Sequence, residues 1–508
     1  MHIFTPPPVQ DETLIQFGQV IQANAAQMGD KPALICNGEV LSWSQLGNRI
    51  ARTTGALRER GFGRGDYVAA LGENSVSHLV LILATLAAGA CIVPLPFSAT
   101  EDALRHMLQD SGARVLFTTR SYADTAARLD APEVLDMSVV DDWSRNATPA
   151  DPVEIHANDL FNLIYSSGTT GTPKGIVHDH RFRSRQLARI TRFGLTPDSR
   201  MVMSTPLYSN TTMFGVLPTL ILGATLILMP KFDITTFLSL SQTWKATHAV
   251  LVPVQYMRLL RAPEFASADL TSYRCKFSTS APLPGSLIAQ IMERWPGNLI
   301  EVYGMTEGGV STALNCAEFP DKWDTVGRPP EGSDVRVIDD QGNELPRGEM
   351  GEIVGRAPSM MPYYHNKPDK TVELLWRAPD GTEFIRTGDM GRIDKDGFIQ
   401  LLDRKKDMII SGGFNIYAAD LESVLRKHTD VADTAVIAIP SADWGETPLG
   451  FVVLTPGSTA TAQDIRDWAN AQLGKTQRLS AIELRDDLPR SEIGKVLKKD
   501  LRAPYWPA

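Results

Sequence analysis

The chain has 508 residues, which is more than one hydrophobic core usually supports, so we expect two or more domains. Hydrophobic residues make up 43% and charged residues 21%, as in ordinary globular proteins, and the net charge of −9 argues against a nucleic-acid-binding surface. Four widely spaced cysteines fit neither a disulfide framework nor a zinc site, and no secretory signal is evident, so we expect a cytoplasmic protein.

The chain from about residue 30 to residue 260 alternates helix-like segments with short, apolar, strand-like segments. This alternation is typical of an α/β architecture with largely parallel sheets. Ligands of such folds bind at the carboxyl ends of strands, so we expect the functional site there. The clearest strand candidates are Val115–Thr118, Leu160–Tyr165, Ala224–Met229 and His248–Pro253.

Two apolar runs, Leu79–Leu95 and Met213–Pro230, are each about long enough to be considered as membrane spans. A glycine and a proline interrupt each run and divide it into a helix-like half and a β-branched, strand-like half. We therefore interpret both runs as core segments and expect no integral membrane association.

A run rich in glycine and hydroxyl groups, YSSGTTGTPKG (Tyr165–Gly175), follows one of the strand candidates. Glycine allows close backbone approach to a ligand, hydroxyls donate hydrogen bonds and Lys174 supplies positive charge, which together suit nucleotide phosphates. The common P-loop pattern is excluded, because Pro173 precedes Lys174 and a glycine follows it. The candidate phosphate-binding residues are Ser166, Ser167, Gly168, Thr169, Thr170, Thr172 and Lys174.

The tripeptide HDH (His178–His180), which comes soon after this run, could be taken for a metal-binding pair. A third cysteine, histidine or carboxylate ligand is not evident, and histidines at alternating positions of a strand are often exposed. We therefore expect exposed side chains here rather than a metal site.

Beyond about residue 325 the chain changes to short strands separated by Gly, Pro and Asp turns, which indicates a β-rich subdomain. The charged cluster DRKKD (Asp403–Asp407) precedes a final segment of about 100 residues. In that segment we expect strands at Ala435–Ile439 and Gly450–Leu454 and a helix at Ala462–Leu473, enough for a small α+β domain.

Four further patches carry groups that suit a nucleotide and a carboxylate: YGMTEGG (Tyr303–Gly309), RTGD (Arg386–Asp389), DRKKDMIISGGFNI (Asp403–Ile416) and PRSEIGKVLKKDL (Pro489–Leu501). An aromatic ring can stack on a base, a glutamate is a hard oxygen ligand for Mg²⁺, and an aspartate can accept hydrogen bonds from ribose hydroxyls. Each patch taken alone also fits an ordinary turn or a solvated charge.

Together with the Gly-rich run, these patches resemble, in this order, motifs of the adenylate-forming superfamily of acyl- and aryl-CoA synthetases, luciferases and peptide-synthetase adenylation domains. YSSGTTGTPKG resembles the phosphate loop of that family, YGMTE its adenine and Mg²⁺ motif, and TGD its ribose motif. DRKKD is similar to the hinge motif and PRSEIGKVL to the catalytic-lysine motif. The segments MMPYYHNKPDKT (Met360–Thr371) and PLYSN (Pro206–Asn210) also resemble family segments.

The resemblance implies an α/β fold with a large N-terminal domain, residues 1–403, made of two α/β sheet subdomains and a β-rich one. A small, mobile α+β domain, residues 404–508, follows. It also implies a ligase with ATP, Mg²⁺ and CoA, in which a carboxylate attacks the α-phosphate of ATP and a thiol then displaces AMP. Two alternatives remain: transfer of the acyl group to a carrier-protein pantetheine, and a non-catalytic nucleotide-binding relative. A homodimer is left open.

The resemblance also assigns roles to residues position by position. Lys495, Thr306 and Glu307 are the expected catalytic residues, Glu307 and Thr170 the expected Mg²⁺ ligands, and Lys406 the hinge. Besides the phosphate loop, the expected nucleotide and CoA contacts are Ser280, Ala281, Pro282, Glu301, Tyr303, Gly304, Asp389, Arg404, Gly412 and Gly413. The expected acyl pocket contains Tyr208, Ser209, Asn210, Thr211, Met213 and Phe214.

Two departures from the family pattern affect these expectations. Ser209 stands where the family commonly carries a histidine, which removes a rotatable gate or base often placed there. Phe414 follows the Gly pair where many relatives have a carboxylate, and we have no physical account of it. The partly polar pocket favours a medium-sized acid, either medium-chain or aryl, over acetate.

Overall fold

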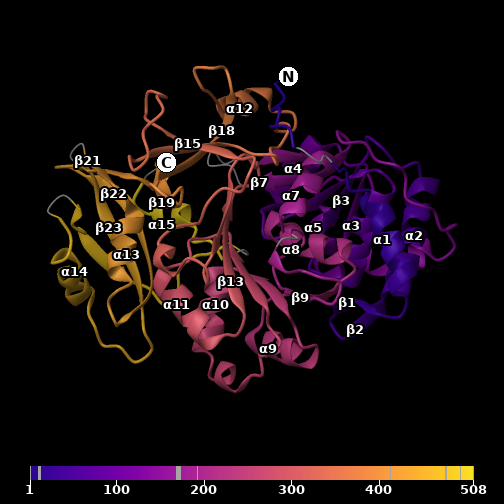
Figure 1. The fold of residues 1–508 in the computed structure, drawn as a ribbon, viewed down its shortest axis with the longest axis horizontal. Coiled ribbons are helices and arrows are strands. Elements are labelled where there is room, and N and C mark those ends of the chain that lie inside the picture. Colours follow the sequence, from indigo (N-terminus) through magenta and orange to yellow (C-terminus); the bar gives the residue numbers. More distant parts are fainter. Residues whose placement is uncertain are drawn as a thin grey trace. The chain divides into compact units, whose positions relative to one another are not determined.

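The computed structural model of the chain describes residues 2–9, 13–166, 173–190, 193–411, 414–474, 477–491 and 494–506. The chain forms two compact units (Figure 1). The first comprises Met1–Asp334 and Gly355–Ile385, and the second comprises Val335–Val354 and Arg386–Ala508. The two units are therefore described separately.

The first unit contains a six-stranded sheet in the order β6-β5-β3-β4-β7-β8. Its strands are β3 (Tyr67–Leu71), β4 (Cys91–Leu95), β5 (Val115–Thr118), β6 (Val134–Asp136), β7 (Leu160–Ser166) and β8 (Lys174–Asp179). Neighbouring strands run parallel except for β7 and β8, which form an antiparallel pair. The predicted phosphate-binding run therefore connects two hydrogen-bonded strands.

An eight-stranded sheet in the same unit has the order β14-β13-β12-β11-β9-β10-β1-β2. Its strands are β1 (Pro32–Cys36), β2 (Glu39–Ser42), β9 (Arg200–Met203), β10 (Thr225–Leu228), β11 (His248–Leu251), β12 (Cys275–Thr279), β13 (Asn298–Gly304) and β14 (Ser311–Asn315). Only the two edge strands, β2 and β14, are antiparallel to their neighbours.

The largest core of the first unit joins one face of each sheet to a shared set of helices. Val68 and Ala70 of β3 belong to this core together with Leu226 of β10 and Val250 of β11. The intervening residues of β3 belong to a separate cluster on the other sheet face, as the alternation of side chains along a strand requires. The helices of the shared layer are α1 (Phe17–Met28), α2 (Trp43–Glu59), α3 (Val76–Ala87) and α8 (Asn210–Ile221).

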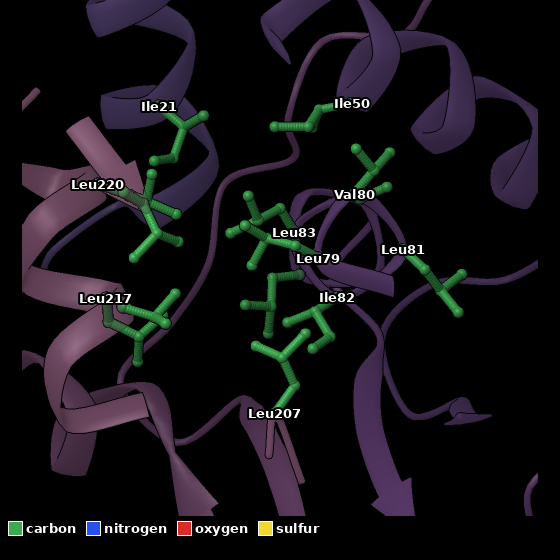
Figure 2. Close-up of a cluster of buried hydrophobic side chains, with 14 of the residues drawn as sticks. Ile21, Ile50, Leu79, Val80, Leu81, Ile82, Leu83, Leu207, Leu217 and Leu220 are labelled. Carbon is green, nitrogen blue, oxygen red and sulfur yellow. The ribbon is translucent and has the colours of Figure 1, made fainter. Parts of the chain in front are cut away.

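Helix α3 is apolar on every side because protein surrounds it on every side. Figure 2 shows Leu79, Ile82 and Leu83 of α3 near Leu207 and Leu217, while other α3 side chains point away from them. All of these residues are buried. A helix that is hydrophobic all round is typical of a buried position, which explains why its sequence resembles a membrane span. No helix among the described residues is long and apolar enough to cross a bilayer.

Further helices cover the outer faces of these sheets. Helix α4 packs on the six-stranded sheet, and α10 and α11 lie beside β13 (Figure 1). Trp295, which follows α11, contacts four aromatic rings of this layer edge-on. The remaining helices of the first unit are α4 (Glu101–Ser111), α5 (Ala123–Ala127), α6 (Val140–Ser144), α7 (His180–Ile190), α9 (Ile234–Thr243), α10 (Pro253–Arg261), α11 (Gly285–Arg294) and α12 (Pro368–Glu373).

A five-stranded sheet contains strands through which the boundary between the units passes. Its order is β15-β16-β18-β17, and β19 also pairs with β18. The boundary falls after Asp334 in β15, after Val354 in β16 and after Ile385 in β18. The strands are β15 (Asp334–Ile338), β16 (Gly351–Arg356), β17 (Leu375–Arg377), β18 (Glu383–Ile393) and β19 (Ile399–Arg404).

The second unit has a five-stranded sheet of its own, in which β21, β20, β23 and β22 follow in order and β24 pairs with β23. Its core contains Ile409, Leu421, Val436 and Ile465. The elements are β20 (Ile409–Ser411), β21 (Phe414–Ile416), α13 (Ala418–Leu425), β22 (Val431–Ser441), β23 (Gly445–Leu454), α14 (Ala462–Asn470), β24 (Ala481–Leu484) and α15 (Lys498–Arg502).

The predicted fold class is confirmed, and so are most of the predicted elements. Both apolar runs divide into a helix and a strand, as expected: α3 with β4, and α8 with β10. The strand predicted at His248–Pro253 is too long, because β11 ends at Leu251 and Pro253 begins α10. Proline suits the first position of a helix, where its missing N–H would have no partner.

Candidate active site

The two ends of the Gly-rich run are held by the β7–β8 pair. Ser166 is the last residue of β7 and lies opposite Lys174, the first residue of β8. A Cβ at Gly175 would lie 2.9 Å from Leu163 Cδ1 and 3.2 Å from His365 Cβ, so a larger residue would have to displace these side chains. The predicted phosphate-binding residues Ser167, Gly168, Thr169, Thr170 and Thr172 lie outside the described residues.

Lys174, Tyr364 and Glu307 come together although they are far apart in sequence. Lys174 Nζ donates to Tyr364 Oη at 3.4 Å, and Tyr364 Oη donates to Glu307 Oε1 at 2.6 Å. The Lys174 ammonium also lies 4.5 Å from the centroid of the Tyr364 ring, within cation–π range. Burial and the nearby Glu307 carboxylate raise the pKa of Tyr364, so its hydroxyl keeps the proton that it donates.

The turn that carries Thr306 and Glu307 is closed by two glycines. Gly308 N–H donates to Met305 O at 3.0 Å, and Gly308 has a φ of 76°. A Cβ at this position would lie 2.2 Å from Ser359 O, so no other residue fits. Met361 N–H donates to the Glu307 carbonyl at 2.8 Å, which joins the turn to the segment that contains Tyr364.

His178 connects the same turn to the protein interior. Its Nε2 lies 2.7 Å from Thr306 O, and a carbonyl only accepts hydrogen bonds, so Nε2 carries the proton. Its Nδ1 then accepts from Arg183 Nη2 at 2.9 Å. Burial and the Arg183 charge lower the pKa of His178 well below its usual value, so the ring is neutral.

The expectation that HDH is exposed is therefore wrong. His178 and His180 are both buried, and Asp179 is 8% exposed. His178 is used by Thr306 and Arg183, and the His180 ring packs edge-on against Phe161 with centroids 5.0 Å apart. Strand β8 ends at Asp179 and His180 begins helix α7, and both α7 and α4 contact β8, so its side chains are covered. Alternating polarity was a misleading signal for this covered strand.

Arg183 of α7 is the centre of a buried polar network. The side chain is fully buried, and its guanidinium donates to Asn162 Oδ1 from Nε at 3.0 Å and from Nη2 at 2.7 Å. Nη1 donates to Gln186 Oε1 at 2.7 Å and to Asn210 Oδ1 at 2.8 Å. The network therefore reaches α8, the predicted acyl-pocket helix.

The predicted adenine loop after β12 contains a strained residue. Ser280 has a φ of 77°, a conformation that a residue with a Cβ rarely adopts. Its hydroxyl shares a 2.6 Å hydrogen bond with Thr211 Oγ1 on α8. Through Ser280, the loop with the predicted nucleotide contacts Ser280, Ala281 and Pro282 is hydrogen-bonded to the predicted acyl-pocket segment.

Two predicted nucleotide contacts on β13 differ in their environment. Tyr303 is partly exposed near the end of the strand, next to the exposed Gly304. Glu301 is only 3% exposed and lies opposite Ser278 in β12. Burial raises the pKa of Glu301 well above its usual value, so its carboxyl group holds a proton more strongly than that of an exposed glutamate. Its assignment as a nucleotide contact remains a prediction.

The loop before α8 is anchored from two sides. Ser209 is the N-cap of α8, and its Oγ accepts from Thr211 N–H at 3.2 Å. Asn74, which is 2% exposed, donates to Thr205 O and Met229 O, both at 2.9 Å, and accepts from Leu207 N–H at 2.8 Å. The serine that replaces the family histidine therefore has a structural role as a helix cap.

Aromatic side chains surround the predicted acyl-pocket residues. The Tyr208 ring meets Phe97 edge-on with centroids 5.2 Å apart, and Phe214 meets Phe277 in the same way at 5.7 Å. Met213 is buried, whereas Asn210 and Thr211 are partly exposed. This segment thus combines aromatic bulk with polar groups.

In the second unit, the predicted ribose-binding residues lie opposite each other. Asp389 of β18 pairs with Arg404 of β19, and Arg404 Nε lies 3.3 Å from Asp389 Oδ1. The Asp389 side chain is 14% exposed and that of Arg404 is 42% exposed, so both reach the surface. Gly412, Gly413 and the side chain of Lys406 lie outside the described residues.

Lys495 lies in a tight loop that is held by Ser491 and Arg490. Ser491 N–H donates to Lys495 O at 2.8 Å, and Lys495 N–H donates to Ser491 Oγ at 3.2 Å. Arg490 donates to Gly494 O at 2.7 Å and forms an ion pair with Asp433 of β22. The backbone of the predicted catalytic lysine is thus anchored to the sheet of the second unit.

Sequence reasoning missed Tyr364 and Arg183. Tyr364 is in a segment that resembles the family, but its pairing with Glu307 joins residues 57 positions apart. Arg183 had no sequence signal, because it is one of four arginines in the polar helix sequence HRFRSRQLARI.

Comparisons with known proteins cover both units. A family model described as AMP-binding enzyme matches residues 21–365, and one described as AMP-binding enzyme C-terminal domain matches residues 420–495. A feruloyl-CoA synthase of Amycolatopsis sp. is 35% identical over 92% of this chain and 94% of its own length. The fatty acid–[acyl-carrier-protein] ligase ScoC of Streptomyces coeruleorubidus is 30% identical over 98% of this chain and 97% of its own.

Solved structures show the same fold over nearly the full chain. ATP-bound MatB from Rhodopseudomonas palustris has a TM-score of 0.85 and 31% identity, covering 96% of this chain and 99% of that one. The o-succinylbenzoate CoA synthetase MenE from Bacillus subtilis, in complex with its acyl-adenylate intermediate, has a TM-score of 0.82 and 26% identity, covering 95% and 97%.

Proposed function

The chain belongs to the AMP-binding enzyme family and is an ATP-dependent carboxylic acid:CoA ligase that acts through an acyl-adenylate, and we propose that its acid carries an aromatic ring. The feruloyl-CoA synthase at 35% identity supports this choice over a medium-chain acid. The aromatic contacts of Tyr208 and Phe214 support it as well, because they provide flat surfaces beside the predicted pocket.

The arrangement of Lys174, Tyr364 and Glu307 is the observation that carries the catalytic proposal. A carboxylate must approach a phosphate of like charge, so the site needs preorganised positive charge. Lys174 would bind the departing pyrophosphate, and Lys495 would bind the carboxylate together with the α-phosphate. Thr306 would donate to the α-phosphate, and Asp389 with Arg404 would hold the ribose.

The residues of the Glu307 turn fit a magnesium ion. Tyr364 occupies one position on Glu307 Oε1, which leaves further lone pairs of the carboxylate for a hard cation. Mg²⁺ typically binds through one or two carboxylates plus phosphates and water, and one such carboxylate is present. When bound, the ion would supply positive charge to the phosphates. We include Thr170 as the second proposed protein contact.

Transfer to a carrier protein remains a second candidate, because ScoC is named as a ligase for an acyl-carrier protein. Gly412 and Gly413 would line the path of a pantetheine arm in either case, so these residues do not distinguish CoA from a carrier.

A reducing location fits the four free cysteines, all of which are buried.

The test is to incubate the purified protein with ATP, Mg²⁺ and a panel of aryl and medium-chain acids. We expect pyrophosphate release with aryl acids, and conversion to acyl-CoA and AMP once CoA is added. Pyrophosphate release without any acyl-CoA, followed by loading of a phosphopantetheinylated carrier, would favour the second candidate. Preference for medium-chain acids would overturn the aryl proposal, and no release with any acid would contradict catalysis.

A further inference from the structure

Arg183 is a buried charge whose described partners are all neutral. Each of its five N–H donors has an acceptor: two reach Asn162, and one each reaches His178, Gln186 and Asn210. Burial lowers the pKa of Arg183 to about 9, which still leaves the guanidinium charged at neutral pH. Within the described ranges, no carboxylate is paired with this charge. Its positive potential is therefore felt by the groups around it.

The guanidinium determines how the amide of Asn210 is oriented. Arginine has N–H donors and no acceptor, so Asn210 must turn its oxygen toward Arg183, as the 2.8 Å contact from Nη1 shows. The Asn210 Nδ2 amino group is then directed away from Arg183. Asn210 is the first residue of α8, and it is partly exposed. Reversing the amide would place two donors face to face and is strongly disfavoured.

We propose that Asn210, oriented by Arg183, donates a hydrogen bond to an oxygen on the acyl group remote from the reacting carboxylate, and that this pair selects acids that carry such an oxygen. The inference rests on the proposed function, because it takes Asn210 as part of the acyl pocket. The acceptor is the oxygen of a hydroxyl, phenolate or methoxy group. The unpaired positive charge behind the amide strengthens the donor and favours negatively polarised oxygens.

A donor in this position gives stronger discrimination than apolar contacts alone. When an acid without the oxygen binds, the Asn210 amino group loses its water and gains no acceptor, which costs affinity. Arg183 prevents the amide from rotating to relieve that cost. Arg183 is thus a positioning residue, and Asn210 is the residue that contacts substrate.

The test compares acids that differ by a single oxygen: cinnamate with 3- and 4-hydroxycinnamate, and hexanoate with 6-hydroxyhexanoate. We expect kcat/KM for adenylation to favour at least one oxygen-bearing acid by about 10-fold or more in the wild type, the scale of one substrate hydrogen bond. In Asn210→Leu this ratio should fall to about 1, chiefly through the KM of the oxygen-bearing acid. The KM of ATP should be the same in Asn210→Leu as in the wild type.

Three further variants separate the donor from the charge. Asn210→Asp keeps an acceptor for Arg183 but offers no N–H. A hydroxyl can still donate to the new carboxylate, so this variant is tested with 4-methoxycinnamate, whose oxygen only accepts, and its ratio to cinnamate should fall below 1. Arg183→Met should lower the ratio as Asn210→Leu does, and Arg183→Lys, which keeps a charged donor, should partly restore it. If the Arg183 variants do not fold, the two Asn210 variants still decide the proposal.

Gln186→Leu is the matched control, because Gln186 accepts from the same Nη1 atom as Asn210. In Gln186→Leu, the ratio of kcat/KM between the oxygen-bearing acid and the acid without the oxygen should equal that of the wild type. A wild-type ratio near 1 for every pair, or an unchanged ratio in Asn210→Leu, would overturn the inference while leaving the ligase intact. Absence of pyrophosphate with all acids would instead reject the proposed function, and the inference with it.

Discussion

At the scale of single residues, Tyr364 connects the only described cation of the phosphate-binding run to the carboxylate of Glu307. Tyr364→Phe removes the hydroxyl but keeps the ring that Lys174 faces. Without that hydrogen bond the Glu307 carboxylate loses its fixed orientation, so we expect a rise of about 10-fold in the Mg²⁺ concentration that gives half-maximal adenylation, the lower end of the range for outer-sphere partners of metal ligands. Titration of the pyrophosphate-release rate with Mg²⁺ measures it.

Tyr363→Phe is the matched control. Tyr363 is the neighbour of Tyr364 in sequence, but its ring packs against the core of the six-stranded sheet and not against Glu307. Its Mg²⁺ dependence should match that of the wild type. Equal shifts in both variants would show that the effect is general loosening of the segment and not loss of the Glu307 hydrogen bond.

Lys495 gives a second prediction at this scale. Lys495→Ala should slow adenylation by at least about 10²-fold, the scale for deleting one preorganised electrostatic donor. Thioester formation from supplied acyl-adenylate should survive, because the proposed contact of Lys495 is with the attacking carboxylate and the α-phosphate. Separate single-turnover assays of the two steps measure this, and an equal fall in both would show that Lys495 is misassigned.

At the scale of elements, the loop that leads into α8 depends on Asn74. Asn74→Ala would leave two carbonyls and one N–H without their partner in a buried place. Each such loss costs about 1–3 kcal/mol, so we expect a fall in stability of about 3 kcal/mol or more. The KM of the acid should rise as well, because Tyr208 and Ser209 belong to this loop. Thermal melting and acid titrations measure the two effects.

Asn298→Ala is the control for this prediction. Asn298 also donates from its side chain, to Asn315 Oδ1 at 2.7 Å, but it is only partly buried on β13. Its loss should cost about 1 kcal/mol or less, because water can replace the partner. If the two variants lose the same stability, Asn74 is not the anchor of the loop.

Elements defined by local pattern could be predicted from sequence, whereas sites made by distant pairing could not. The runs that became α3 with β4, and α8 with β10, carry their own breaks and were predicted correctly. The exposure of His178 was predicted wrongly, because alternation along β8 says nothing of the helix that covers it. The Arg183–Asn210 contact joins residues 27 positions apart on two helices, and no local pattern records it.

At the scale of the whole molecule, buried histidines should make the protein sensitive to acid. Burial lowers the pKa of His78, His180 and His248 to about 4 each, against about 6.5 in an unfolded chain. The unfolded state therefore binds more protons below pH 6.5, so stability is full above that pH and falls toward pH 4. Each histidine contributes up to about 3 kcal/mol to the fall.

Asp179 opposes this trend, because burial raises its pKa to about 6. As the pH falls, Asp179 takes up a proton in the folded protein before it does so in the unfolded chain, which stabilises the folded state. Glu301, whose pKa is also raised by burial, opposes the trend as well, whereas the lowered pKa of His178 adds a fourth histidine to it. The histidines outweigh these two carboxyl groups, so we expect a lower melting temperature at pH 5 than at pH 7. Differential scanning at both values measures the change. His248→Asn should make the difference between the two pH values smaller, and an equal or larger difference would contradict the assignment.

The path of the chain through β16 and β18 has a consequence for protein engineering. The chain passes from one unit to the other after Asp334, Val354 and Ile385, so no single cut separates the units. A fragment that begins at Arg404 would lack two parts of the second unit, Val335–Val354 and residues 386–403. Any exchange of the second unit with a relative must therefore transplant two separate segments, and an insertion or fusion is best placed at the chain ends and not at one of these three crossings.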